Sequence, residues 1–212
     1  MAIYALGDRV PKIAEDAYVH PEAVVIGDVT IGSGSSIWPN AVLRGDYGTI
    51  IIGNDTSIQD GTVIHATDEL PTIVGDRCVV GHIVHLEGCT IESDSLVGSG
   101  SVVLHRCIVR SHSLVGANAV VTNDSEVPSY AMALGIPAKI IPNRVAKGDF
   151  DEAVTLYVAK NRAATRAEEA TTTSPDLTGS ATIVGIRAPA THASWKRISY
   201  LANVRPCFSV EI

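Results

Sequence analysis

An aliphatic residue recurs at every sixth position through the middle of this 212-residue chain, and no other feature restricts its fold as strongly. The register runs without a slip through Ile91, Val97, Val103, Val109, Val115 and Val121. Four residues after most of these positions sits a small side chain. Hexapeptide repeats predict a parallel β-helix, in which three hexads make one triangular coil and coils stack about 4.8 Å apart. The predicted fold class is therefore an all-β parallel β-helix, followed by a C-terminal α-helix.

Three interruptions of the repeat mark candidate functional loops. The interval from Leu43 to Ile52 is nine residues instead of six, the interval from Ile64 to Val74 is ten, and the interval from Leu86 to Ile91 is five. We expect the extra residues to bulge from corners of the prism around 44–48 and 66–72. A rigid scaffold often displays binding loops at such corners.

The predicted organisation has three parts. Residues 1–142 form the β-helix, and residues 143–162 form a helix that packs on it. The apolar positions at helical spacing are Phe150, Ala153, Val154, Tyr157 and Val158. Residues 163–212 are rich in Thr, Ser, Gly and Pro and lack periodicity, so they are expected to be a disordered or loosely ordered tail.

The bulk composition excludes several classes of function. A net charge of -7 and the lack of a basic run argue against nucleic-acid binding. The chain has no run of about 18 apolar residues, so no membrane span is expected. The N-terminus does not resemble a signal peptide, so a cytoplasmic protein is expected. The four cysteines have no paired metal-binding spacing and are expected to be buried reduced thiols.

Three of the seven histidines gather in one region and suggest a metal site. His65 follows the inward Ile64, and the hexad count places it directly beneath Glu87. His85 and Glu87 flank the inward Leu86, so both should point outward. His82 belongs to the preceding face. A neighbouring copy related by threefold symmetry could bring its His82 to His65, and imidazoles suit zinc and similar divalent metals.

The motifs of residues 44–46 (RGD), 59–61 (QDG), 63–65 (VIH), 80–82 (VGH), 88–89 (GC) and 134–135 (LG) resemble the γ-class carbonic anhydrase family over roughly residues 1–160. This resemblance implies a homotrimer of left-handed β-helices with a metal at the subunit interfaces. It implies that His65 and His82 are ligands and that Arg44 and Asp46 form interface ion pairs. It also implies that Gln59 hydrogen-bonds the metal-bound water and that Asp60 supports the site.

Two departures from the family pattern concern the third ligand and proton transfer. Glu87 stands where the family has its third histidine, and His85 lies two residues before it. Glu87 has the better position and His85 the better ligand chemistry, so we favour His85 as the third ligand and Glu87 as a catalytic carboxylate. The acidic shuttle loop is also not evident, because the 66–72 stretch offers only Asp68 and Glu69.

Three functions remain open from the sequence. The first is reversible hydration of carbon dioxide to bicarbonate by hydroxide on Zn²⁺, Fe²⁺, Co²⁺ or another divalent metal. The second is a hexapeptide acyltransferase that uses a histidine base and coenzyme A. The third is a binding or scaffold protein with a catalytically weak metal site. His105 and His112 are expected to be solvent-exposed strand residues outside the site.

Overall fold

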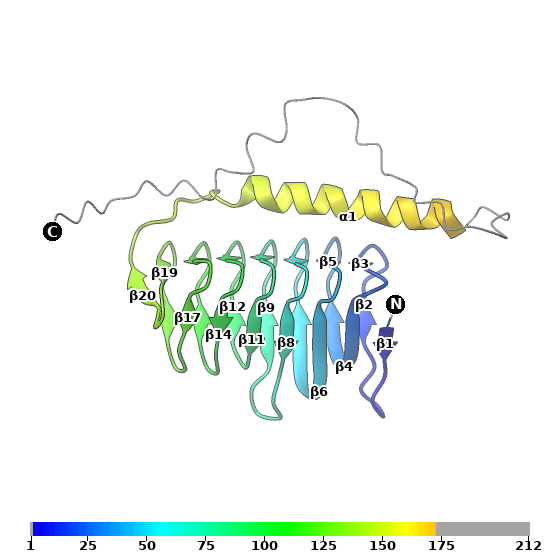
Figure 1. Cartoon of the computed structure of the whole chain (residues 1–212), viewed down its shortest axis with the longest axis horizontal. Helices are drawn as coiled ribbons and strands as arrows, with labels where there is room; N and C mark the ends of the chain where they lie inside the picture. The colour runs from blue at the N-terminus through cyan, green and yellow to red at the C-terminus, as the bar shows by residue number, and fades with distance from the viewer. Residues whose placement is uncertain (1, 173–212) are drawn as a thin grey trace. The chain divides into compact units, whose positions relative to one another are not determined.

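The fold is described from a computed structural model, for residues 2–172. Its strands coil into a three-faced prism, and one helix lies along the prism (Figure 1). The predicted all-β fold, a parallel β-helix of hexapeptide repeats with a C-terminal helix, is confirmed.

Two faces of the prism belong to one twelve-stranded sheet, because the long strands β4 and β6 turn the corner between them. Its strands are β1 (Ala2–Tyr4), β2 (Lys12–Ile13), β4 (Val24–Ile31), β6 (Val42–Ile52), β8 (Val63–His65), β9 (Thr72–Val74), β11 (His85–Glu87), β12 (Thr90–Ile91), β14 (Val102–Val103), β15 (Ile108–Val109), β17 (Val120–Val121) and β18 (Glu126–Val127). We call the face formed by β8, β11, β14, β17 and the first halves of β4 and β6 the first face, and the face that contains β9 and β12 the second face.

The third face is an eight-stranded sheet. Its strands are β3 (Tyr18–Val19), β5 (Ser36–Ile37), β7 (Ser57–Ile58), β10 (Val79–Val80), β13 (Leu96–Val97), β16 (Leu114–Val115), β19 (Met132–Leu134) and β20 (Lys139–Ile141). All pairings in this sheet are parallel except that of β19 with β20. Each coil therefore buries its apolar side chains against the coils above and below it, and stability is close to a sum of stacking terms.

The hexad aliphatic residues fill the interior as predicted. Ile58, Ile64, Leu86, Ile91 and Val97 are fully buried and belong to one continuous core. The small residues of the repeat, including Thr62, Ser95 and Ser101, are buried at the corners. Thr62, for example, donates its hydroxyl hydrogen to the Gly81 carbonyl at 2.7 Å, which satisfies a polar group in the interior.

The interrupted hexads take two different forms. The extra residues near 44–48 are absorbed within β6, which stays paired with β4 through a register shift between Gly27 and Val29. The insertion after β8 forms a loop of residues 66–71 that projects past the neighbouring turns (Figure 1). Asp68 and Glu69 are exposed in this loop.

The C-terminal helix α1 (Asp151–Thr172) covers part of the third face, where it contacts β3, β5 and β7. It continues past Arg162, where the sequence pattern predicted its end. The predicted apolar stripe packs with Val79 and Leu96 of the prism. The expectation of a disordered tail falls, from residue 173 on, outside the described residues.

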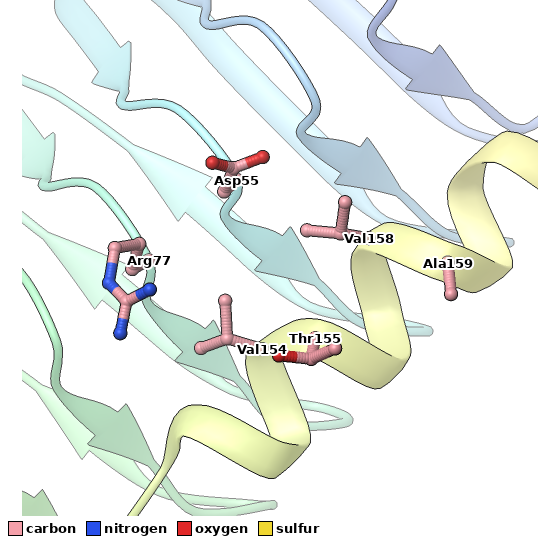
Figure 2. Close-up of a pocket in the computed structure, with 6 residues that line it drawn as sticks. All are labelled: Asp55, Arg77, Val154, Thr155, Val158 and Ala159. Atoms are coloured by element: carbon pink, nitrogen blue, oxygen red, sulfur yellow. The ribbon is translucent and has the colours of Figure 1, made fainter. Parts of the chain in front are cut away.

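Polar contacts fix the helix at its N-terminal end and at its middle. Asn161 is 1% exposed and donates its side-chain amide to the carbonyls of Gly34 and Ser35 at 2.9 and 3.1 Å. Arg77 of the prism contacts Asp151 and also pairs with Asp94. A groove beside this attachment is lined by Asp55, Arg77, Val154, Thr155, Val158 and Ala159 (Figure 2). None of the predicted site residues lines it, and its arginine already serves helix attachment.

Two further observations bear on function. Cys78, Cys89 and Cys107 are buried free thiols, as expected, and burial raises the pKa of Cys78 and Cys89 to about 12, which makes them poor nucleophiles. Among residues 2–172, no helix is long and apolar enough to cross a membrane.

Candidate metal centre

The site is organised around a vertical column of three polar residues on the first face. Arg44 of β6 pairs in register with His65 of β8, and His65 pairs with Glu87 of β11. Each follows a buried aliphatic residue of the repeat, so alternation turns all three side chains outward. The hexad pattern alone therefore aligns them, one coil above another.

Carboxylates hold both ring nitrogens of His65. Nδ1 lies 2.7 Å from Glu87 Oε1, and Nε2 lies 3.1 Å from Asp46 Oδ1, with the His65 side chain 15% exposed. A neutral imidazole has one N–H and can satisfy only one of these acceptors. Both contacts are favourable only if the ring is an imidazolium or if a cation replaces the proton at Nε2. This donor set therefore fits a divalent metal beside His65 Nε2.

The two carboxylates are held in their charged forms. A hydrogen bond from His65, acting against desolvation, lowers the pKa of Glu87 below its ordinary value. Desolvation tends to raise the pKa of Asp46, but hydrogen bonds from Arg44 and His65 outweigh it, so that this pKa is also lowered. The Arg44–Asp46 ion pair forms within one chain, two residues apart. Its predicted role at a subunit interface stays a prediction.

His85 joins the same cluster from the start of β11. Its Nε2 lies 3.3 Å from Glu87 Oε2, so the Glu87 carboxylate lies between His65 and His85. Both candidates for the third ligand thus face outward on the first face and touch each other. A carboxylate that accepts from two imidazoles is well placed to orient them.

His82 lies at the other edge of the first face. It is in the turn between β10 and β11, and its Nδ1 lies 2.9 Å from Asp60 Oδ2 in the turn one coil below. Both side chains are about half exposed. This contact occupies Nδ1 and leaves Nε2 as the nitrogen for an external ligand.

The two histidine sets do not close a metal site within one chain. His65 and Glu87 end their strands, whereas His82 precedes β11, so they stand at opposite edges of the first face. In residues 2–172, no three His, Cys, Asp or Glu side chains converge well enough to hold a metal ion. A metal that uses both His65 and His82 requires a second copy of the chain.

Gln59 is placed differently from its predicted role. It is 4% exposed, and it hydrogen-bonds Tyr157 of helix α1. Burial raises the pKa of Tyr157, and this hydrogen bond offsets only part of that increase. In the single chain Gln59 therefore contributes to helix packing. Its predicted contact with metal-bound water stays a prediction.

Two residues near the cluster were not predicted from the sequence. Arg9, in the turn before β2, donates to the backbone carbonyl of Asp46. His105 was expected on a strand in solvent, and this was wrong. It lies in a turn, its side chain is 33% exposed, and its Nε2 is 3.7 Å from Glu87 Oε1. The hexapeptide repeat does not predict either position. It determines which strand side chains point inward or outward, whereas the orientation of a turn side chain depends on the neighbouring coil.

His112 was also predicted on an exposed strand and instead lies in a turn. Its ring stacks on Tyr130, with centroids 5.1 Å apart. It takes no part in the cluster around Glu87.

Comparisons with known proteins identify the family of this chain. The family described as bacterial transferase hexapeptide (six repeats) matches residues 11–45 and 88–123. A probable carbonic anhydrase of Methanocaldococcus jannaschii is 51% identical over 129 residues, which are 61% of this chain and 81% of that protein. This chain belongs to the γ-carbonic anhydrase-like family of hexapeptide-repeat proteins.

Two further proteins similar to this chain carry different functional names. Mitochondrial gamma carbonic anhydrase 2 of Arabidopsis thaliana is 42% identical over 140 residues, which are 63% of this chain. The match spans only half the length, 50%, of that plant protein. A crystal structure from Bacillus cereus, described as a putative acetyltransferase, is 34% identical with a TM-score of 0.76, and covers 78% of this chain and 98% of its own.

Proposed function

We propose that this protein is a γ-carbonic anhydrase-like metalloprotein that forms a homotrimer and reversibly hydrates carbon dioxide to bicarbonate. The observation that carries the proposal is His65, whose two nitrogens both face carboxylates in a column that the repeat itself builds. The relationship to a probable carbonic anhydrase at 51% identity supports the same reaction.

The metal would be held by His65 of one copy, His82 of a neighbouring copy, and His85 as the third ligand. Zn²⁺, Fe²⁺ and Co²⁺ all suit such a set of imidazoles. The metal would supply Lewis acidity and so lower the pKa of a coordinated water to about 7.

The chain's own residues orient the ligands and handle the proton. Glu87 would accept the Nδ1 hydrogen of His65 and so leave Nε2 of the ring to hold the metal. Asp60 does the same for His82 through Nδ1. Hydration of carbon dioxide releases one proton, and the ionised Glu87 carboxylate would accept it. Asp68 and Glu69, exposed on the 66–71 loop, then offer a route to solvent.

A second candidate function, acyl transfer from coenzyme A, is favoured by one observation. The His82–Asp60 pair is half exposed at a corner, and a histidine held at Nδ1 by a carboxylate is also suited to act as a general base through Nε2. The Bacillus cereus structure described as a putative acetyltransferase is consistent with this reading.

One set of measurements on a single purified sample separates the candidates. We expect about one metal per chain by elemental analysis, a trimer mass by light scattering, and carbon dioxide hydration that is lost on chelation and restored by Zn²⁺ or Co²⁺. A metal-free protein that binds coenzyme A would favour the acyltransferase. A metal-loaded trimer without hydration activity would favour the third possibility, a binding or scaffold protein.

A further inference from the structure

His105 has a buried ring nitrogen without a partner, directly beside the site. Its Nε2 is the one buried side-chain nitrogen or oxygen in residues 2–172 that lacks a hydrogen-bond partner. The side chain as a whole is 33% exposed, but its Nε2 is buried. A buried donor without an acceptor is unfavourable, so its orientation needs an explanation.

The nearest charged group explains that orientation. Nε2 of His105 lies 3.7 Å from Glu87 Oε1, the oxygen that also contacts His65. His85 contacts the other oxygen of Glu87, so three imidazoles from three successive coils surround this one carboxylate. Nε2 of His105 therefore faces an ionised oxygen just outside hydrogen-bond range, which favours the tautomer with the hydrogen on Nε2.

The turn that carries His105 is fixed by the coils on either side. Arg106 N donates to the Gly88 carbonyl at 2.7 Å, and Asp124 N donates to the His105 carbonyl at 3.0 Å. Gly88, at φ +60°, leaves room for the ring, since a Cβ there would lie 2.9 Å from His105 Cδ2 and 3.0 Å from Leu70 Cβ. The imidazole therefore rests on the backbone that follows Glu87, and Leu70 of the 66–71 loop lies beside it.

We propose that His105 is a positioning residue of this site, whose Nε2, 3.7 Å from Glu87 Oε1, attracts the Glu87 carboxylate and so helps to fix the group that orients His65. The inference rests on the proposed function for its effect on metal binding. The contact between His105 and Glu87 itself does not depend on that function. Removal of such an outer partner typically lowers metal affinity about 10–100-fold.

The test combines a metal-free and a metal-loaded measurement on the full chain. In the presence of a chelator, urea midpoints are measured for wild type, His105→Leu, Glu87→Gln and the double variant. His105→Leu should lower the midpoint in the wild-type background and have a clearly smaller effect when Glu87 is already Gln. Equal shifts in both backgrounds would overturn the proposal, whether or not the protein binds metal.

The metal-loaded measurement uses Co²⁺ affinity, by chelator competition, and the visible absorption of the bound ion. His105→Leu should weaken Co²⁺ binding at least tenfold. His105→Gln keeps an N–H donor and should recover most of the loss. An unchanged affinity in His105→Leu would contradict the positioning role. Failure of wild type to bind Co²⁺ would refute the proposed function alone and leave the metal-free cycle as the deciding result.

Discussion

Glu87 contacts more side chains of the site than its neighbours do, and its charge links the site to pH. It accepts from His65 and His85, and these contacts lower its pKa. Because the folded-state pKa lies below the ordinary value of 4.5, the stabilising contribution is complete above about pH 4.5. It is lost as the pH falls through the folded-state pKa.

Glu87→Gln should therefore change both the stability and its pH dependence. At pH 7 we expect a loss of about 1.5–3 kcal/mol, the usual range for a hydrogen bond to a charged group. Below about pH 4.5 the variant should decline less steeply than wild type in urea unfolding. Glu126→Gln is the matched control, because Glu126 pairs with Arg110 at the surface, where such pairs contribute little. Parallel pH profiles for wild type and Glu87→Gln would contradict this prediction.

Substitutions of His85 and Glu87 test which of the two is the third metal ligand. If His85 is the ligand, His85→Ala should lose most of the bound metal after dialysis, while Glu87→Gln should bind the metal more weakly, still retain more of it than His85→Ala does, and lose hydration activity. The reason is that Glu87 then acts on His65 and on the released proton instead of on the metal. Elemental analysis of both variants, with stopped-flow hydration assays, measures this. The reverse pattern would make Glu87 the ligand and His85 a neighbour.

At the scale of elements, the hexads predicted the features that alternation along a strand dictates. The buried positions of Ile64 and Leu86, the stacking of His65 beneath Glu87 and the apolar stripe of the helix all came from periodicity. Corners were not predictable in the same way. His105 is aimed by the coil beneath it, through Gly88, and no local pattern encodes that relation.

The helix boundaries were also only partly predictable. The carboxylate of Asp149, two residues before the helix, accepts from the Ala146 N–H at 2.8 Å. The helix is held by Asn161, whose partners lie more than 120 residues earlier in the chain. Contacts of this range depend on the finished prism, so the sequence around the helix does not reveal them.

Asn161→Ala should detach the C-terminal part of helix α1 from the prism. The substitution removes the donor to the carbonyls of Gly34 and Ser35, at a cost of about 1–3 kcal/mol. We expect faster amide hydrogen exchange along the helix and a lower urea midpoint. Thr155→Ala is the control, because Thr155 is an exposed residue of the same helix. Unchanged exchange in Asn161→Ala would show that the apolar stripe alone holds the helix.

At the scale of the whole molecule, Ile83 is the residue that the single chain does not explain. It follows His82, it is 73% exposed, and it has a positive φ of 57°, which is unusual for a β-branched residue. Val63, on the first face, is also an exposed apolar residue, at 40%. A backbone strain of about 1–3 kcal/mol persists only where something compensates for it. Burial of this apolar corner against a neighbouring copy would do so, and it would bring His82 to the same interface.

Ile83→Asn should therefore act in opposite directions on the chain and on the assembly. Asparagine tolerates a left-handed backbone, so the isolated chain should gain about 1 kcal/mol in urea unfolding under conditions where it is monomeric. The trimer should dissociate at higher protein concentration in light scattering, and metal should be lost with it, because His82 and His65 reach one metal only across the interface. Leu156→Asn, a change at an exposed apolar residue of helix α1, should leave the assembly unaffected. If the Ile83→Asn trimer dissociates at the same protein concentration as wild type, this corner is not at the interface. The proposed role of His82 as a ligand from a neighbouring copy would then also be contradicted.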